Sequence, residues 1–137
     1  MRNRYLALSV LFLAAQLQGC SATAQSEPSI IDAWQVQRVA AQVLPLDSGL
    51  TLTLDKDKRA HGNGGCNMFQ GSYDVQGSDL TFGPLAATRM ACPTPQMEIE
   101  QLFFRNLAKV ASYQLEGNTL NLLARDGGVV VVLRQSK

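Results

Sequence analysis

His61 and the glycine run 62–65 behind it are the first residues of this sequence to examine for catalytic chemistry. A general-base histidine needs a nucleophile and an orienting carboxylate, but the chain lacks a Gly-x-Ser-x-Gly elbow and offers only Asp57 as a partner. A phosphate-binding loop would lead into a helix and carry a Lys-Ser/Thr pair, whereas this run leads into a strand. We therefore expect a solvent-facing histidine at a strand end, a tight turn whose glycines adopt positive φ, and no enzyme.

The sequence also gives little support for a metal site. Asp55-Lys56-Asp57 begins like a calcium loop, but the downstream glycine and the bidentate glutamate are missing, and the neighbouring lysines would repel the ion. Zinc on Cys66 and Cys92 would need two more ligands, and His61 is the only histidine of the chain. We expect no metal site and no cofactor, and a solvated turn at residues 55–58.

A third cysteine, Cys20, stands in a context typical of lipidation. Arg2 and Arg4 precede an apolar stretch that is too short to anchor in a bilayer, and Leu17-Gln18-Gly19-Cys20 follows with the pattern of a bacterial lipobox. The cysteine thiolate would accept the lipid, and the small Gly19 would give the peptidase access to the bond. An ordinary secretory signal with a chance cysteine is the alternative. The pattern favours a signal peptide at 1–19, lipidation of Cys20 and a flexible tether over 20–29.

The expected destination is the periplasmic face of the bacterial outer membrane. An aspartate behind the acylated cysteine is the usual retention signal, and this chain has Ser21 there. Stable anchoring needs more than one acyl chain, palmitate among them. Without residues 1–19 the net charge of +1 becomes about −1, so neither a nucleic-acid footprint nor a polybasic membrane patch is expected.

If Cys20 carries lipid, Cys66 and Cys92 remain as an even pair in an exported protein. Their spacing is not that of a C-x-x-C redox motif. We favour a structural disulfide between these two cysteines. Closing a loop of this size stabilises a fold by about 3–4 kcal/mol on the chain-entropy model.

Residues 30–137 predict a single domain that is mainly β-structure. About eight short strands are indicated by alternating apolar residues between turn signals, and the run 129–133 is apolar enough to require cover on both faces. Trp34, Tyr73 and Phe82 could line a ligand cavity, but aromatic residues on strand faces usually belong to the core. The candidate strands are residues 34–39, 50–54, 59–63, 69–75, 80–82, 85–91, 113–116, 120–123 and 129–133.

One helix is predicted over about 94–110. Thr94 is placed to cap it, and Pro95 suits a first helical position. Phe104 lies beside the main apolar stripe, so it either widens the buried face or contacts something else. The stripe follows three- and four-residue spacings and should pack on the sheet: Met97, Ile99, Leu102, Phe103, Leu107 and Val110. The fold class is therefore α+β, a curved antiparallel sheet closing on one helix.

Several motifs along residues 30–134 together resemble the META/HslJ-like domain family. They are Gly65-Cys66-Asn67, an aromatic Phe69 with Gly71-x-Tyr73, Gly77-x-x-Leu80-x-Phe82, Thr88-x-Met90-x-Cys92, and the helical Glu100, Phe103 and Leu107. The residues that carry the resemblance would serve the scaffold: Trp34, Gly65, Cys66, Asn67, Gly71, Tyr73, Thr88, Met90, Cys92, Glu100 and Phe103. One departure is Asp32-Ala33, where the family often has a glycine before the tryptophan.

The resemblance implies a partly open β-barrel with its helix packed at one side. It also implies a heat-shock or stress-related envelope protein that acts as a protein-binding, chaperone-like or pilot-like module. We accordingly expect a monomer with an envelope protein as partner. The alternative is a carrier of a lipid or small hydrophobic ligand in a cleft between helix and barrel.

Overall fold

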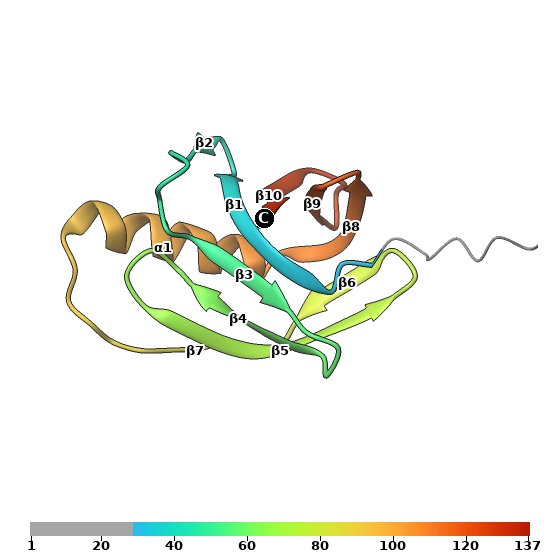
Figure 1. The fold of residues 1–137 in the computed structure, drawn as a ribbon, viewed down its shortest axis with the longest axis horizontal. Coiled ribbons are helices and arrows are strands. Elements are labelled where there is room, and N and C mark those ends of the chain that lie inside the picture. Colours follow the sequence, from blue (N-terminus) through green and yellow to red (C-terminus); the bar gives the residue numbers. More distant parts are fainter. Residues whose placement is uncertain (1–28) are drawn as a thin grey trace, which may run out of the picture.

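The computed structural model describes residues 29–137. The predicted signal peptide, Cys20 and all but the last residue of the tether lie outside this range. No helix within it is long and apolar enough to cross a bilayer. Its elements, shown in Figure 1, are β1 (Asp32–Val39), β2 (Gln42–Val43), β3 (Thr51–Leu54), β4 (Arg59–Asn63), β5 (Met68–Gln76), β6 (Asp79–Phe82), β7 (Ala86–Ala87), α1 (Thr94–Leu107), β8 (Val110–Glu116), β9 (Thr119–Ala124) and β10 (Val129–Gln135).

Eight antiparallel strands form a closed barrel, with α1 as its helix. The strands follow the order β10-β9-β8-β6-β5-β4-β3-β1, and β10 returns to pair with β1 from Trp34↔Gln135 to Val39↔Val131. The expectation of a curved sheet or partly open barrel is therefore wrong in this respect. The apolar β10 is hydrogen-bonded on both sides, by β9 and β1, which removes the sheet edge that it would otherwise expose.

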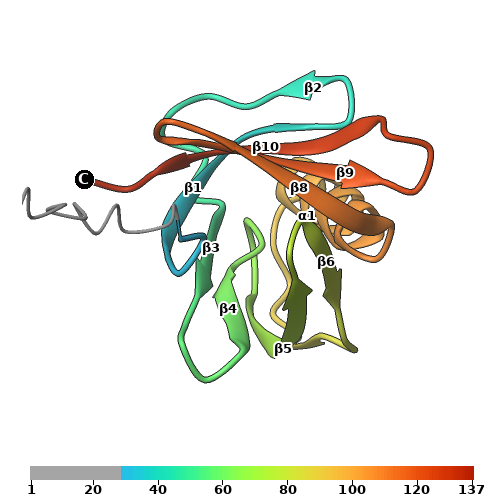
Figure 2. The ribbon, with the colours of Figure 1, turned by 90° about the vertical axis from the view of Figure 1, so that its right-hand side faces the viewer.

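The seam between β6 and β8 is the weakest part of this closure. It holds one register pair, Asp79↔Ser112, and a neighbouring hydrogen bond from the Tyr113 amide to the Ser78 carbonyl oxygen at 3.0 Å. Figure 2 shows α1 behind the region where β6 and β8 lie. Phe104 and Ala108 from the end of the helix line a groove with Phe82, the last residue of β6.

Large apolar side chains fill the inside of the barrel. In β3 the leucines are buried and the threonines half-exposed, as the alternating sequence predicts. Phe103 of α1 is fully buried, and its ring lies 5.8 Å from that of Phe69 on β5. Phe104 widens the buried helical face, since its ring lies 5.4 Å from Phe69. The largest fully buried side chains are Trp34, Phe103, Leu50, Leu52, Leu54, Leu80, Leu107, Leu120, Leu122, Leu133, Val36 and Val39.

The helix differs from its sequence prediction at both ends. Pro93, extended at φ −52° and ψ 147°, is the N-cap, and no side chain of residues 29–137 makes a capping hydrogen bond, so the cap predicted for Thr94 is wrong. The Pro93 carbonyl oxygen accepts the amides of Gln96 and Met97 instead. The helix ends at Leu107, because Val110 already pairs with β9. Likewise the strand expected at 85–91 is reduced to the two residues of β7.

Truncation of Phe103 tests the position of the helix in the core. Phe103→Ala should lower the free energy of unfolding by about 3–5 kcal/mol, because it leaves a cavity beside Phe69. Met97→Ala is the control on the same helix, where the side chain is 37% exposed, and it should change stability by less than about 1 kcal/mol. Urea unfolding followed by circular dichroism measures both. Equal losses in the two variants would contradict this packing.

Candidate functional site

Five of the family-motif residues, Cys66, Asn67, Thr88, Met90 and Glu100, meet at the turn between β4 and β5 around a buried carboxylate. Glu100 on α1 is 8% exposed. Its Oε2 accepts the backbone N–H of Cys66 at 3.1 Å and of Asn67 at 2.5 Å, and its Oε1 accepts the Asn67 side-chain amide at 2.8 Å. Three donors thus replace the water that the carboxylate loses on burial. We call Glu100, Cys66 and Asn67 the helix–turn clamp.

Asn67 connects the clamp to the chain segment that precedes the helix. Its Oδ1 accepts the Thr88 hydroxyl at 2.9 Å and the Met90 backbone N–H at 2.7 Å. The Asn67 side chain thus reaches residues more than twenty positions away in the sequence. Within the turn itself, a residue that the sequence analysis did not single out makes the local side-chain bond, since the Asn63 side-chain oxygen accepts the Gly65 amide at 2.7 Å. An Asx turn at Asn63, just before two glycines, was the available signal.

The Cys66–Cys92 disulfide is present, and it fastens the same turn to the residues before α1. The two Cα atoms lie 5.9 Å apart across a sequence separation of 26. Segment 83–93 is consequently held by the disulfide at its end, by Asn67 in its middle and by the pairing of β7 with β5. This strap lies against the barrel wall although it has little regular structure of its own.

The turn glycines are explained by close packing as well as by φ. Gly65 has φ +115°, a conformation that side chains disfavour. At Gly64 a Cβ would lie 2.8 Å from the Phe104 ring and 2.9 Å from the Glu100 carboxylate. The expectation that positive φ accounts for the whole run was therefore incomplete. Gly71 is similar, because a Cβ there would lie 2.6 Å from Leu85 in the strap.

Two aromatic motif residues, Trp34 and Tyr73, belong to the core, and their polar atoms form hydrogen bonds within the domain. Trp34 donates its indole N–H to the Ile30 carbonyl oxygen at 2.9 Å, and Tyr73 donates its hydroxyl to the Asp55 carbonyl oxygen at 2.6 Å. Burial, with the nearby charge of Asp55, raises the pKa of the Tyr73 phenol. Both side chains are less than 5% exposed, so they line no accessible cavity.

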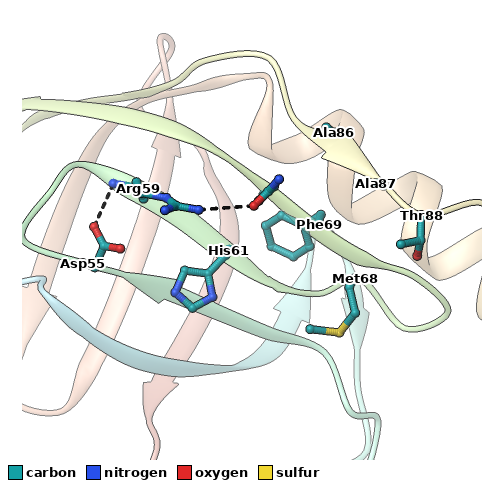
Figure 3. A pocket seen from close by; sticks show the side chains of 9 residues that line it. Asp55, Arg59, His61, Met68, Phe69, Ala86, Ala87 and Thr88 are labelled. Atoms are coloured by element: carbon teal, nitrogen blue, oxygen red, sulfur yellow. Dashed lines mark hydrogen bonds between the residues drawn. The ribbon is translucent and has the colours of Figure 1, made fainter.

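An open groove of about 510 Å³ lies on the outer face of the barrel wall (Figure 3). It collects outward-facing side chains of β4 and β5 and the beginning of the strap. His61 is solvent-exposed, as predicted, but it lies in the middle of β4 and not at a strand end. The lining residues are Asp55, Arg59, His61, Met68, Phe69, Gln70, Ala86, Ala87 and Thr88. We call this depression the outer groove.

The polar groups of the outer groove have few partners within it. One terminal nitrogen of Arg59 donates to the Gln70 side-chain oxygen at 3.3 Å, while Asp55 accepts the Arg59 backbone N–H at 3.0 Å (Figure 3). Across residues 29–137, no three His, Cys, Asp or Glu side chains gather as metal ligands. Beside the groove, Lys58 pairs with Asp74 at 2.7 Å; this bond lowers the pKa of the Asp74 carboxyl and raises that of the Lys58 amine.

A second groove, of about 480 Å³, lies between the end of α1 and the other side of the strap. Its lining contains no charged side chain and includes three large apolar residues, Phe82, Leu85 and Phe104. This is the place between helix and barrel where the sequence suggested a cleft for a hydrophobic ligand. We call it the helix groove.

Comparison with known proteins identifies the family. The family model described as META domain matches residues 28–137. This chain belongs to the META domain family. Its matched region begins just ahead of β1 and includes every element of the barrel, so the helix–turn clamp is a feature of this META domain. No curated protein matches the chain.

Solved structures similar to this META domain share its fold. The NMR structure of a protein from Burkholderia xenovorans is 30% identical with a TM-score of 0.58, over 77% of this chain and 79% of that one. A second protein solved by NMR is 22% identical with a TM-score of 0.61, over 77% and 89%. The crystal structure of a DUF4847 family protein from Bacteroides vulgatus is 17% identical with a TM-score of 0.53, over 66% and 61%.

Neutralising Glu100 tests the helix–turn clamp. Glu100→Gln should lower the free energy of unfolding by about 1.5–3 kcal/mol. The substitution replaces one carboxylate oxygen by an NH₂ group, which cannot accept a hydrogen bond from the N–H group that faces it. Glu98→Gln, at an exposed position of the same helix, is the matched control and should change stability by less than about 0.5 kcal/mol. Chemical denaturation of the three proteins gives the comparison. A Glu100 effect no larger than that of Glu98 would show that the clamp does not support the fold.

Proposed function

We propose that this protein is a non-enzymatic bacterial envelope lipoprotein whose META domain is a stress-related, protein-binding module of the chaperone or pilot type. The observation that carries the proposal is the internal use of the motif side chains. Glu100 and Asn67, the polar residues with the greatest chemical capacity, are buried and fully engaged in holding the helix, turn and strap. Ligand contact is then left to the outer surface, as in a binding module.

The disulfide and the lipobox support a place in the envelope. Disulfides persist in oxidising compartments such as the periplasm, and Cys66–Cys92 joins the β4–β5 turn to the end of the strap here. Lipid on Cys20 would tether the domain through residues 21–29, which span at most about 30 Å when extended. The domain would therefore work close to a bilayer, on the periplasmic face of the outer membrane, in keeping with Ser21 behind the cysteine.

The second candidate function is carriage of a lipid or another small hydrophobic molecule. The helix groove favours it, because its lining is uncharged and its volume of about 480 Å³ falls within the range of ligand sites. The groove is an external depression, however, whereas the inside of the barrel holds large buried side chains. A carrier would have to shield its ligand at this exposed site.

Removal of the acylated thiol tests the anchor. Cys20→Ala should shift the protein from the membrane to the soluble or unprocessed fraction, because no thiol remains to accept lipid. Ser21→Asp should keep the lipid but leave the protein in the inner membrane. Sucrose-gradient fractionation with mass spectrometry of the mature N-terminus measures both. A Cys20→Ala protein that is still acylated and membrane-bound would overturn the anchor assignment.

Crosslinking in the envelope and mass spectrometry of the purified protein separate the two candidate functions. A binding module should give a reproducible crosslink to one envelope protein from a photoreactive residue placed at Met68, which is 54% exposed at the outer groove. A carrier should instead release lipid when the natively purified protein is extracted, and Leu85→Glu should abolish that lipid. Lipid bound in stoichiometric amount, without any crosslinked protein, would favour the carrier function and contradict the proposed protein-binding function.

A further inference from the structure

The outer groove holds a cation that this domain does not neutralise. Within the described residues, the ion pair is that of Lys58 with Asp74, and the adjacent Arg59 pairs with no carboxylate. The carboxylate of Asp55 accepts backbone N–H groups of Asp57 and Arg59, each at 3.0 Å, and so serves its own turn. The Arg59 guanidinium donates to the side-chain oxygen of Gln70, and Figure 3 shows it directed away from Asp55.

Two neutral donors flank this cation because of the strand register. His61 on β4 lies directly opposite Gln70 on β5, and the buried Phe69 next to Gln70 faces inward, so His61 and Gln70 share the outer face. Gln70 uses its side-chain oxygen to accept from Arg59, which leaves its NH₂ free to donate outward. An imidazole N–H of His61 can do the same. Arg59, His61 and Gln70 therefore form a donor row with a positive charge.

Apolar side chains border the donor row on the side of the strap. Met68 is 54% exposed, and Ala86 and Ala87 of β7 are exposed beside it. The groove of about 510 Å³ thus offers an anion site and an adjoining apolar floor. The flexible thioether of methionine adapts to side chains of different shapes, which suits a floor that contacts peptide.

Asp55 decides which anion fits. Its negative charge at one end of the groove repels a doubly charged phosphate or a row of phosphodiesters more strongly than it repels a single carboxylate. A single carboxylate with apolar neighbours complements the groove instead. Arg pairs carboxylates well, because its planar fork of N–H groups matches their two oxygens.

We propose that the outer groove binds an Asp or Glu side chain within an extended segment of a partner protein. Arg59 pairs with the carboxylate, His61 and Gln70 donate to it, and the small apolar residues beside it lie on Met68, Ala86 and Ala87. This assignment rests on the protein-binding function proposed above and names the surface that would perform it.

Two capped peptides that differ in one charge test the assignment. The mature lipidated protein, isotope-labelled and held in detergent micelles, is titrated with acetyl-Ala-Glu-Ala-amide and with acetyl-Ala-Gln-Ala-amide, and backbone amide shifts are followed by NMR. The glutamate peptide should shift the amides of Arg59, His61 and Gln70. Its affinity should exceed that of the glutamine peptide by about tenfold, the size of one charge-assisted hydrogen bond.

Adjacent charge variants provide the control. Arg59→Gln should weaken the glutamate peptide by about tenfold, to the level of the glutamine peptide. Lys58→Gln removes the same charge one residue away, where it is already paired with Asp74, and should change the affinity by less than about twofold. The dispersion of the remaining amide signals shows that each variant is folded.

Several results would overturn the assignment. They are equal binding of the two peptides, equal weakening by both variants, shifts centred on Phe104 and Leu85, or tighter binding of inorganic phosphate than of the glutamate peptide. If the peptide fails while the Met68 crosslink to an envelope protein persists, the assignment of an acidic side chain to the groove is wrong and the protein-binding function stands. If the crosslink is lost as well, both the groove assignment and the proposed protein-binding function are wrong.

Discussion

A carboxylate buried without a cationic partner determines the arrangement of this domain. Taking Glu100 out of water is costly, and within the described chain it meets no Lys or Arg, so the N–H groups of Cys66 and Asn67 must supply the compensation. Hydrogen bonds to a charged acceptor are worth about 1.5–3 kcal/mol each, and three of them are comparable to the cost of burial. They form only when α1 and the β4–β5 turn stand in one relative position. The carboxylate therefore specifies where the helix lies, which the apolar contacts of Phe103 and Leu107 leave less strictly defined.

The remaining architecture follows from that position. Since α1 is fixed, Phe104 and Ala108 lie near Phe82 at the end of β6, where they line the helix groove. Asn67 extends the same network to the strap, and the disulfide secures the strap at its end. Glu100, Cys66 and Asn67 are buried, so these motif residues support the scaffold, whereas Thr88 and Met90 of the same motif are exposed.

The sequence predicted the local elements well because their signals are local. Alternation of Leu and Thr placed β3, and the charged turn before Arg59 placed β4 with its observed bounds. Barrel closure was missed, because pairing of β1 with β10 depends on contacts between the two ends of the domain and has no local signature. The helix begins at Thr94, within its predicted bounds, but Thr94 was assigned as the cap where the structure has Pro93 without a side-chain capping bond. The pairing of Cys66 with Cys92 could be inferred because the lipobox context of Cys20 left these two as an even pair in an exported protein.

The candidate site was predicted only in part for a similar reason. His61 was noticed, yet Arg59 and Gln70 gain their importance from the register that sets β4 against β5, which no spacing along the chain reveals. Asn67 was identified, but its long-range partners were not, because Thr88 and Met90 approach it only through the path of the strap. Short-range patterns indicate which residues matter, whereas their partners depend on the three-dimensional fold.

Ala87 of β7 lies between the two grooves of the domain. It lines the outer groove and also the helix groove, so the thin ribbon of β7 is a partition common to both depressions. Any displacement of this partition that widens one depression narrows the other. A molecule beside the helix and a segment lying on the barrel wall would therefore contact opposite sides of the same two-residue strand.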